Sequence, residues 1–176
     1  VGGPQVLPAG YCAVSNSGSS GSLIHNVVFN TISNNTSASP AVPPFFTIYN
    51  QTTTVNIGQT YPLSITIDPI GVYTGAIASV WIDYNRDGVY DASEWQQIGT
   101  NIPSGTTATI NVTIPLTALP GLTGMRIRTR GALNTNGATS SCIFMGSGES
   151  EDYQVNIQAA PANPYTYTWN TVPAAT

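Results

Sequence analysis

The chain has 176 residues, a length that provides one domain with a substantial core and little room for a second. Only 7% of its residues are charged, against about 25% in an average protein, and the net charge is −4. Because nucleic acids and anionic membranes bind basic surfaces, this charge balance argues against both partners. No apolar run approaches the roughly 20 residues of a membrane-spanning helix, so insertion in a membrane is not expected. The low charge and the many Thr, Ser and Asn residues favour a secreted, extracellular or cell-surface β-protein.

Alternation of apolar and polar residues with period two predicts a chain built from β-strands. The predicted strands are, in chain order, 26–32, 45–49, 53–57, 61–67, 76–82, 109–114, 125–130 and 153–157. The 76–82 segment is apolar on both faces, which predicts a central strand. In 125–130, Met125 and Ile127 share one face and the arginines share the other. Short strands separated by Gly and Pro turns are typical of an all-β fold, and we expect an antiparallel β-sandwich of the jelly-roll or immunoglobulin-like kind.

The two ends of the chain differ in composition from the region between them. The expected organisation is a linker, a sandwich domain, and a second linker with the first strand of a further domain, over residues 1–10, 11–158 and 159–176. The lack of an initiator Met and of a signal-peptide pattern indicates a mature or excised piece of a larger protein. In 165–170, Tyr165, Tyr167 and Trp169 share one face, so this strand alternatively docks on the sheet edge of a neighbouring molecule.

The two cysteines, Cys12 and Cys142, predict a disulfide. An even number of cysteines in a chain of this composition is typical of an oxidising compartment. The bridge would close a loop of about 130 residues, which contributes about 4–5 kcal/mol in the chain-entropy model. The alternative is a pair of free, buried thiols.

Seven of the eight acidic residues fall in two clusters, and the first matches a calcium-binding loop. Residues 83–94 fit the pattern D-x-[DN]-x-[DN]-G-x5-E at every specified position. Such a loop winds around one point, and Gly88 permits its sharp turn. The predicted ligands are side-chain oxygens of five residues and one backbone carbonyl, from Asp83, Asn85, Asp87, Val89 (carbonyl), Asp91 (through water) and Glu94 (both oxygens).

Six or seven hard oxygen ligands favour Ca²⁺ over Mg²⁺, and the lack of Cys or His near the loop argues against zinc. The segment before the loop is a predicted strand, so the loop does not belong to an EF-hand. The sequence therefore predicts a structural calcium ion in a β-protein. The alternative is a metal-free Asp/Asn/Gly turn.

The second acidic cluster enters the last predicted strand with Glu149, Glu151 and Asp152. Arg126 and Arg128 share one face of a strand that precedes it, so we expect cross-strand Arg–Glu ion pairs. Asp152 is expected among these structural ion pairs, and the alternative for it is to reach the calcium ion or cap a backbone turn. The alternatives for this cluster are a second metal site and an acidic rim that binds a ligand.

The order of these motifs resembles that of the GEVED domain family. The segments that carry the resemblance are Tyr11-Cys12, Val80 to Gly88 with Glu94 behind it, Ile114-Pro115, Met125 to Arg128, Cys142, and Gly148 to Val155. The motif that names the family is Gly-Glu-Val-Glu-Asp, and here Ser150 replaces the Val. The resemblance spans about residues 11–158. It implies a non-catalytic β-sandwich module of a large secreted bacterial protein, of the kind that accompanies proteases, glycan-active enzymes and adhesin repeats and is often exported by type IX secretion.

Catalysis is not expected from the residues themselves. The single histidine, His25, lies in a predicted strand, and Ser147 lacks the G-x-S-x-G elbow of a hydrolase. Glu149 and Glu151 would lie about 7 Å apart, within the range of about 5–9 Å that glycosidases use. Nearby arginines are expected to keep both glutamates ionised, whereas a general acid needs a raised pKa.

Three non-catalytic functions are consistent with the sequence. The first is a structural spacer that contacts neighbouring domains of the same polypeptide. The second is a module that binds a glycan or protein at the cell surface through aromatic residues around the acidic loop, namely Tyr73, Tyr84, Tyr90 and Trp95. The third is a self-associating subunit of a filament or array that uses its sheet edges.

Overall fold

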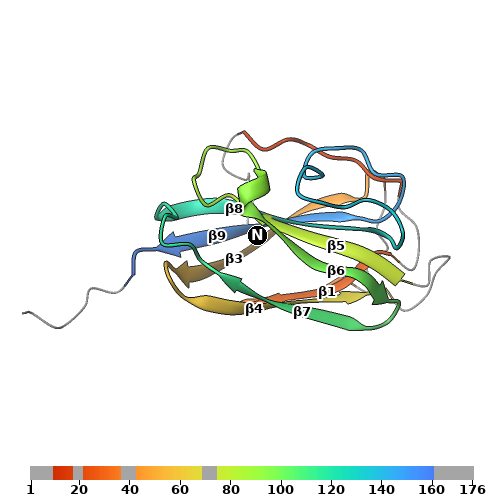
Figure 1. Ribbon diagram of the computed structural model, residues 1–176, viewed down its shortest axis with the longest axis horizontal. Coiled ribbons are helices and arrows are strands. Elements are labelled where there is room, and N and C mark those ends of the chain that lie inside the picture. Colours follow the sequence, from red (N-terminus) through yellow and green to blue (C-terminus); the bar gives the residue numbers. More distant parts are fainter. Residues whose placement is uncertain (1–9, 18–21, 37–42, 69–74, 161–176) are drawn as a thin grey trace, which may run out of the picture.

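The apolar faces of the strands are packed against one another in two sheets, as the computed structural model shows for residues 10–17, 22–36, 43–68 and 75–160 (Figure 1). One sheet has four strands in the order β2-β1-β4-β7, with bounds Ile32–Asn35, Ile24–Phe29, Thr60–Ile67 and Thr107–Thr113. The other has five strands in the order β3-β9-β8-β5-β6, with bounds Phe46–Asn56, Ser150–Gln158, Gly121–Gly131, Gly75–Ile82 and Trp95–Pro103. A short 3₁₀ helix, η1 (Ala92–Glu94), precedes β6. The predicted all-β sandwich is confirmed.

The core lies between the two sheets and comes from the alternating positions that the sequence indicates. Leu63, Ile65 and Ile67 of β4 are fully buried, and Met125 and Ile127 of β8 face them from the other sheet. β5 is buried on both faces and lies between β8 and β6, which confirms the predicted central strand. Across the described residues, no helix has the length and apolarity needed to cross a lipid bilayer.

Three features of the sheets differ from the predictions. The predicted strand 26–32 is a hairpin of β1 and β2, because the chain reverses at Asn30, whose φ of 52° is a left-handed conformation that Asn tolerates. The predicted strands 45–49 and 53–57 form one strand, β3, which pairs in parallel with β9, so the sandwich is not wholly antiparallel. β6 was not predicted, because its apolar residues Trp95, Ile98 and Ile102 do not alternate with period two.

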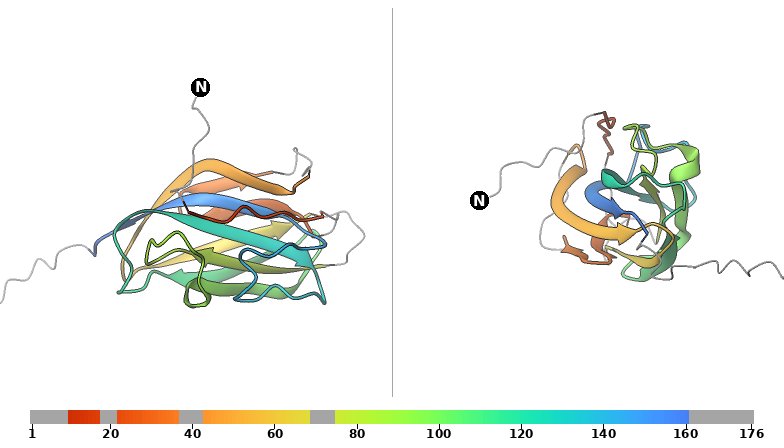
Figure 2. Two further views of the ribbon diagram at one scale, coloured as in Figure 1. Left: turned by 90° about the horizontal axis from the view of Figure 1, so that it is seen from above. Right: turned by 90° about the vertical axis from the view of Figure 1, so that its left-hand side faces the viewer.

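The outer faces of the two sheets are different. On the four-stranded sheet, hydroxyl groups of β4 and β7 pair across the strands at 2.7–2.8 Å: Thr60 with Thr113, Ser64 with Thr109, and Thr66 with Thr107. On the five-stranded sheet, the outer face is covered by residues 10–17 and 132–149, which we call the loop layer (Figures 1 and 2).

The expected linker 1–10 and the 159–176 segment, with its 165–170 strand, lie outside the described residues except for Gly10 and residues 159–160.

A disulfide joins the two parts of the loop layer. It links Cys12 to Cys142 across a sequence separation of 130 residues, as predicted. Asn16 adds a bridge to Met145, so the two segments lie side by side along the sheet.

Removal of the disulfide should therefore destabilise the domain. In a Cys12→Ser/Cys142→Ser variant the unfolded chain gains freedom, and the free energy of unfolding should fall by about 4–5 kcal/mol. Urea unfolding of the variant and the oxidised protein measures the difference. Equal unfolding midpoints and slopes would show that the bridge contributes nothing.

Candidate functional site

The acidic loop begins where β5 ends, and its first residue is held from two sides. Asp83 is fully buried. Its carboxylate accepts hydrogen bonds from the backbone N–H of Asp87 at 3.3 Å and of Gly88 at 3.0 Å. The hydroxyl of Tyr11, in the loop layer, donates to the same carboxylate at 2.6 Å. Gly88 has a φ of 83°, which explains the glycine at this turn.

The next two predicted ligands form successive turns along the loop. The side-chain oxygen of Asn85 accepts from the N–H of Asp87 at 3.0 Å, and Asp87 accepts from the N–H of Val89 at 2.8 Å. The Asn85 amide also donates to Asp87 at 2.9 Å. Side chains that bond to backbone N–H groups two residues ahead are typical of tight Asx turns.

Glu94, the last predicted ligand, closes the loop through the backbone. Its carboxylate accepts from the N–H groups of Tyr84 at 2.7 Å, Asn85 at 3.2 Å and Asp91 at 3.0 Å. Burial raises the pKa of Glu94 above its ordinary value, and these N–H groups oppose the rise. Glu94 therefore joins the start of the loop to its end in this conformation.

The residue types of the acidic loop fit calcium, but in this conformation their side chains are not placed together as a metal site. A carboxylate has about four acceptor positions, and hydrogen bonds fill three on Asp83, three on Glu94 and two on Asp87. Each keeps at least one position for an ion. To contribute both oxygens to a calcium ion, Glu94 would have to give up hydrogen bonds to its backbone partners. Within the described ranges, no group of three or more His, Cys, Asp or Glu side chains is placed to hold a metal.

The aromatic residues expected to contact a ligand have different environments. Tyr90 is only 3% exposed, because it stacks on Tyr11 at 4.7 Å between ring centroids and lies under the guanidinium of Arg126 at 4.9 Å. Tyr90 is thus a structural residue. Trp95 is half-buried opposite Trp81 on β5, Tyr84 lines a pocket, and Tyr73 lies outside the described residues.

The arginines of β8 point away from the core into the loop layer. Arg126 is fully buried and forms a two-bond ion pair with Asp152 of β9, each bond 2.7 Å. It also donates to the carbonyls of Cys12 at 2.8 Å and Ser141 at 3.0 Å. Burial works to lower the pKa of Arg126, but the hydrogen bonds and charge of Asp152 outweigh it and raise that pKa.

Arg128 is fully buried two residues further along the same face. It donates to the Ser150 hydroxyl at 2.8 Å, to the Asn16 side chain at 2.9 Å and to the carbonyl of Ile143 at 2.8 Å. It also donates to the carbonyl of Ser140. Burial and the charge of Arg126 lower the pKa of Arg128. The two guanidinium groups together bind both segments of the loop layer to the sheet.

The expected Arg–Glu pairing is wrong. Arg126 lies directly opposite Asp152, and Arg128 lies opposite Ser150. Directly opposed residues of antiparallel strands share a face of the sheet, so Glu149 and Glu151 lie on the other face. Asp152 is paired with Arg126 and does not reach the acidic loop.

A comparison of the sequence with models of protein families finds a match to this region of the chain. The model of the GEVED domain matches residues 77–156, which run from β5 through the acidic loop and both buried arginines to β9. The chain contains a GEVED domain. The comparison with curated proteins finds no match. The family assignment indicates an accessory module of a larger protein.

The glycine of the GEVED motif is required by its surroundings. Gly148 has a φ of 79°, and a Cβ atom at this position would lie 2.0 Å from the carbonyl oxygen of Thr129. The N–H of Thr129 donates to the carbonyl of Glu149 at 2.9 Å, which holds the motif against β8. A side chain at position 148 would therefore separate the two strands.

The two glutamates of the GEVED motif lie inside the sandwich. Glu149 is 4% exposed and accepts from the N–H of Ile24 at 3.1 Å, and Glu151 is 0% exposed and accepts from the Tyr153 hydroxyl at 2.7 Å. The second oxygen of Glu151 has no hydrogen-bond partner among the described residues. Burial raises the pKa of Glu149 to about 7, with a contribution from Asp68. Burial and the charge of Glu149 raise the pKa of Glu151 well above its ordinary value.

The expectation that arginines keep these glutamates ionised is therefore wrong. Arg126 and Arg128 lie on the opposite face of the sheet, and the pKa values are raised. What separates the glutamates from any substrate is their burial between the sheets.

Several contacts of the GEVED domain were not predicted from the sequence. Tyr11 binds Asp83 and Thr123, and Asn16 binds Arg128 and Ser150. Tyr11 stands directly before Cys12 in the motif that carries the family resemblance, and this position could have indicated a structural role for Tyr11. Asn16 stands in an irregular segment, and no pattern marks it.

The ion pair between Arg126 and Asp152 should be essential to the fold. An Asp152→Asn substitution leaves a buried guanidinium without its counter-charge, and the free energy of unfolding should fall by about 3–5 kcal/mol. The matched control is Asp91→Asn, an exposed residue, which in calcium-free buffer should change stability by less than about 0.5 kcal/mol. Equal effects of the two substitutions in urea unfolding would contradict this role.

The buried glutamates should make the domain more stable in mild acid than at alkaline pH. Both pKa values are raised on folding, so the stabilisation is complete below the unfolded value and is lost as pH rises through the folded value. A rise in the pKa of Glu149 from 4.5 to about 7 corresponds to a loss on the order of 3 kcal/mol by pH 8.

Urea unfolding between pH 4.5 and 8 measures this dependence. A Glu151→Gln variant, which cannot ionise, should show a flatter profile and greater stability than the wild type at pH 8. A wild-type profile that rises with pH would contradict this prediction, as would a variant profile of unchanged slope.

Proposed function

We propose that this GEVED domain is a non-catalytic structural module of a secreted or cell-surface protein, and that a calcium ion stabilises its acidic loop. The observation that carries the proposal is the burial of the family's polar signature. Arg126, Arg128, Glu149, Glu151 and Asp152 all lie inside the domain. Their side chains bind strands and loops of the same chain, so the signature serves to build a scaffold.

The extracellular assignment is supported by the Cys12–Cys142 disulfide. Such bridges persist in oxidising compartments and are rare in the cytosol. The uncharged hydroxyl pairs on the four-stranded sheet are consistent with a surface that faces solvent or a neighbouring domain of the same polypeptide. We therefore propose neighbouring domains as the principal partners.

The calcium proposal is supported by the donor set of residues 83–94. Asp83, Asn85 and Asp87 are already ordered by hydrogen bonds to the loop backbone, which limits the conformational entropy that binding would cost. Each keeps an acceptor position, and Glu94 would complete a set of hard oxygen ligands of the kind that Ca²⁺ takes by exchanging its backbone partners for the ion. The ion would stabilise the turn and supply no chemistry.

Calcium should raise the thermal stability of the domain. An ion that binds only the folded state at a hundredfold excess over its Kd stabilises that state by about 3 kcal/mol. Calorimetric unfolding in Ca²⁺ and in EDTA should therefore give a clearly higher Tm in Ca²⁺. An Asp87→Asn variant should lose most of this difference, because it removes a charged ligand but keeps an acceptor for the Val89 N–H.

The matched control is Asp68→Asn, which removes the same charge outside the loop and should keep the response to calcium. If the wild type unfolds at one temperature in Ca²⁺ and EDTA, the loop is a metal-free turn.

A further inference from the structure

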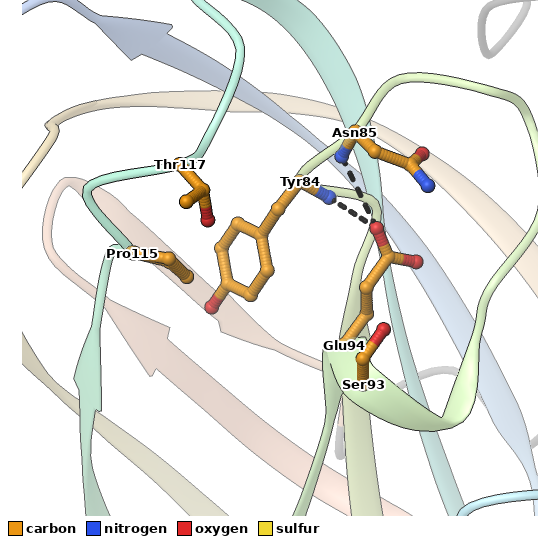
Figure 3. A pocket seen from close by; sticks show the side chains of 6 residues that line it. All are labelled: Tyr84, Asn85, Ser93, Glu94, Pro115 and Thr117. Atoms are coloured by element: carbon orange, nitrogen blue, oxygen red, sulfur yellow. Dashed lines mark hydrogen bonds between the residues drawn. The ribbon is translucent and has the colours of Figure 1, made fainter.

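A pocket lies beside the acidic loop and is lined by a mixture of aromatic and polar side chains. It is a pocket open to solvent with a volume of about 220 Å³, lined by Tyr84, Asn85, Ser93, Glu94, Pro115 and Thr117. Figure 3 shows the Tyr84 ring at its centre, with Pro115 and Thr117 on one side and Glu94 and Ser93 on the other. The lining residues come from the acidic loop, from η1 and from the segment after β7.

The backbone of Tyr84, the central residue of the pocket, is held by hydrogen bonds on both sides. The N–H of Tyr84 donates to Glu94 at 2.7 Å, and its carbonyl accepts from the N–H of Leu119 at 2.8 Å. The Tyr84 ring also packs against the hydrophobic core. A ligand that contacts the remaining exposed part of the ring therefore meets a side chain whose backbone needs no reordering, which favours binding.

The polar groups of the pocket select the chemistry of the ligand. Ser93 and Thr117 offer hydroxyl groups that donate and accept, whereas the Asn85 amide bonds to Asp87 within the acidic loop. Three of the roughly four acceptor positions of Glu94 are filled by backbone N–H groups, so it can accept about one hydrogen bond from a ligand. These groups suit a ligand rich in hydroxyls.

The charge of the lining residues and the volume of the pocket restrict the class of ligand that it can bind. The only charged residue of the lining is Glu94, and the nearby Arg86 donates to the carbonyls of Pro120 and Leu122 outside it. An anionic ligand would therefore be repelled. A volume of 220 Å³ is below the range of about 300–1,000 Å³ that holds a drug-sized molecule, and it suits one small ring.

We infer that this pocket binds a single neutral sugar residue, such as the terminal residue of a glycan. The C–H face of a pyranose ring would lie on Tyr84, while its hydroxyl groups bond to Ser93, Thr117 and Glu94. This binding role is additional to the proposed structural function. It depends on the loop conformation described above, in which Glu94 keeps its three backbone partners. A calcium ion that takes both oxygens of Glu94 would compete with the sugar for the remaining acceptor position.

The test is titration of the full chain with neutral methyl glycosides of glucose, galactose, mannose and N-acetylglucosamine, followed by amide chemical shifts. At least one glycoside should shift the amides of Tyr84, Ser93 and Thr117 with a Kd on the order of 1 mM, as expected for a small ligand. Glucuronate, which is anionic, should cause no shift there.

Variants of the residues that line the pocket test whether the sugar binds there. Thr117→Ala and Ser93→Ala, both at exposed positions, should each weaken binding severalfold, and Tyr84→Ala should abolish it. The matched control is Thr109→Ala on the other sheet, which should leave the affinity unchanged. The absence of shifts for every neutral glycoside at millimolar concentration would overturn the inference, as would equal affinity in Thr117→Ala, Ser93→Ala and the control. Repetition in EDTA separates this result from the calcium proposal, because binding that persists without calcium supports the sugar site alone.

Discussion

Two buried guanidinium groups hold the outer layer of this domain to its five-stranded sheet. Arg126 and Arg128 project from β8 away from the core, and their donors reach carbonyl groups in both segments of the loop layer. Irregular loops carry backbone carbonyls that are costly to bury without partners. The arginines satisfy those carbonyls, and Asp152 supplies the counter-charge that makes one of the two buried cations tolerable. The disulfide joins the same two segments covalently.

The acidic loop is connected to this layer through a tyrosine. The Tyr11 hydroxyl binds Asp83, its ring stacks on Tyr90, and Tyr90 in turn lies against Arg126. Tyr11 adjoins Cys12, so direct contacts link the acidic loop to the disulfide and to Arg126. Two of the four cations in the chain are thus buried inside the domain. The exposed face of the four-stranded sheet relies instead on paired hydroxyl groups for its contact with water.

Much of the fold could be predicted because period-two alternation is a local property. Leu63, Ile65 and Ile67 indicate their strand and their buried face without knowledge of any neighbour. The same alternation places Glu151 on the face of Tyr153, Val155 and Ile157, so its burial was predictable, but a charged side chain was expected to lie outside. The partner of Arg126 depends on the register of two strands, which no local pattern specifies. The contacts of Asn16 and the Ser140 carbonyl depend on loops without periodicity, and these contacts required the structure.

The central claim is that the buried arginines bind the loop layer to the sheet. Amide hydrogen exchange of an Arg128→Met variant tests it most directly, because methionine fills similar space without any donor. The account predicts faster exchange in residues 10–17 and 132–149, while β4 and β7 of the other sheet keep the protection of the wild type. Unchanged exchange in both segments of the loop layer would contradict it.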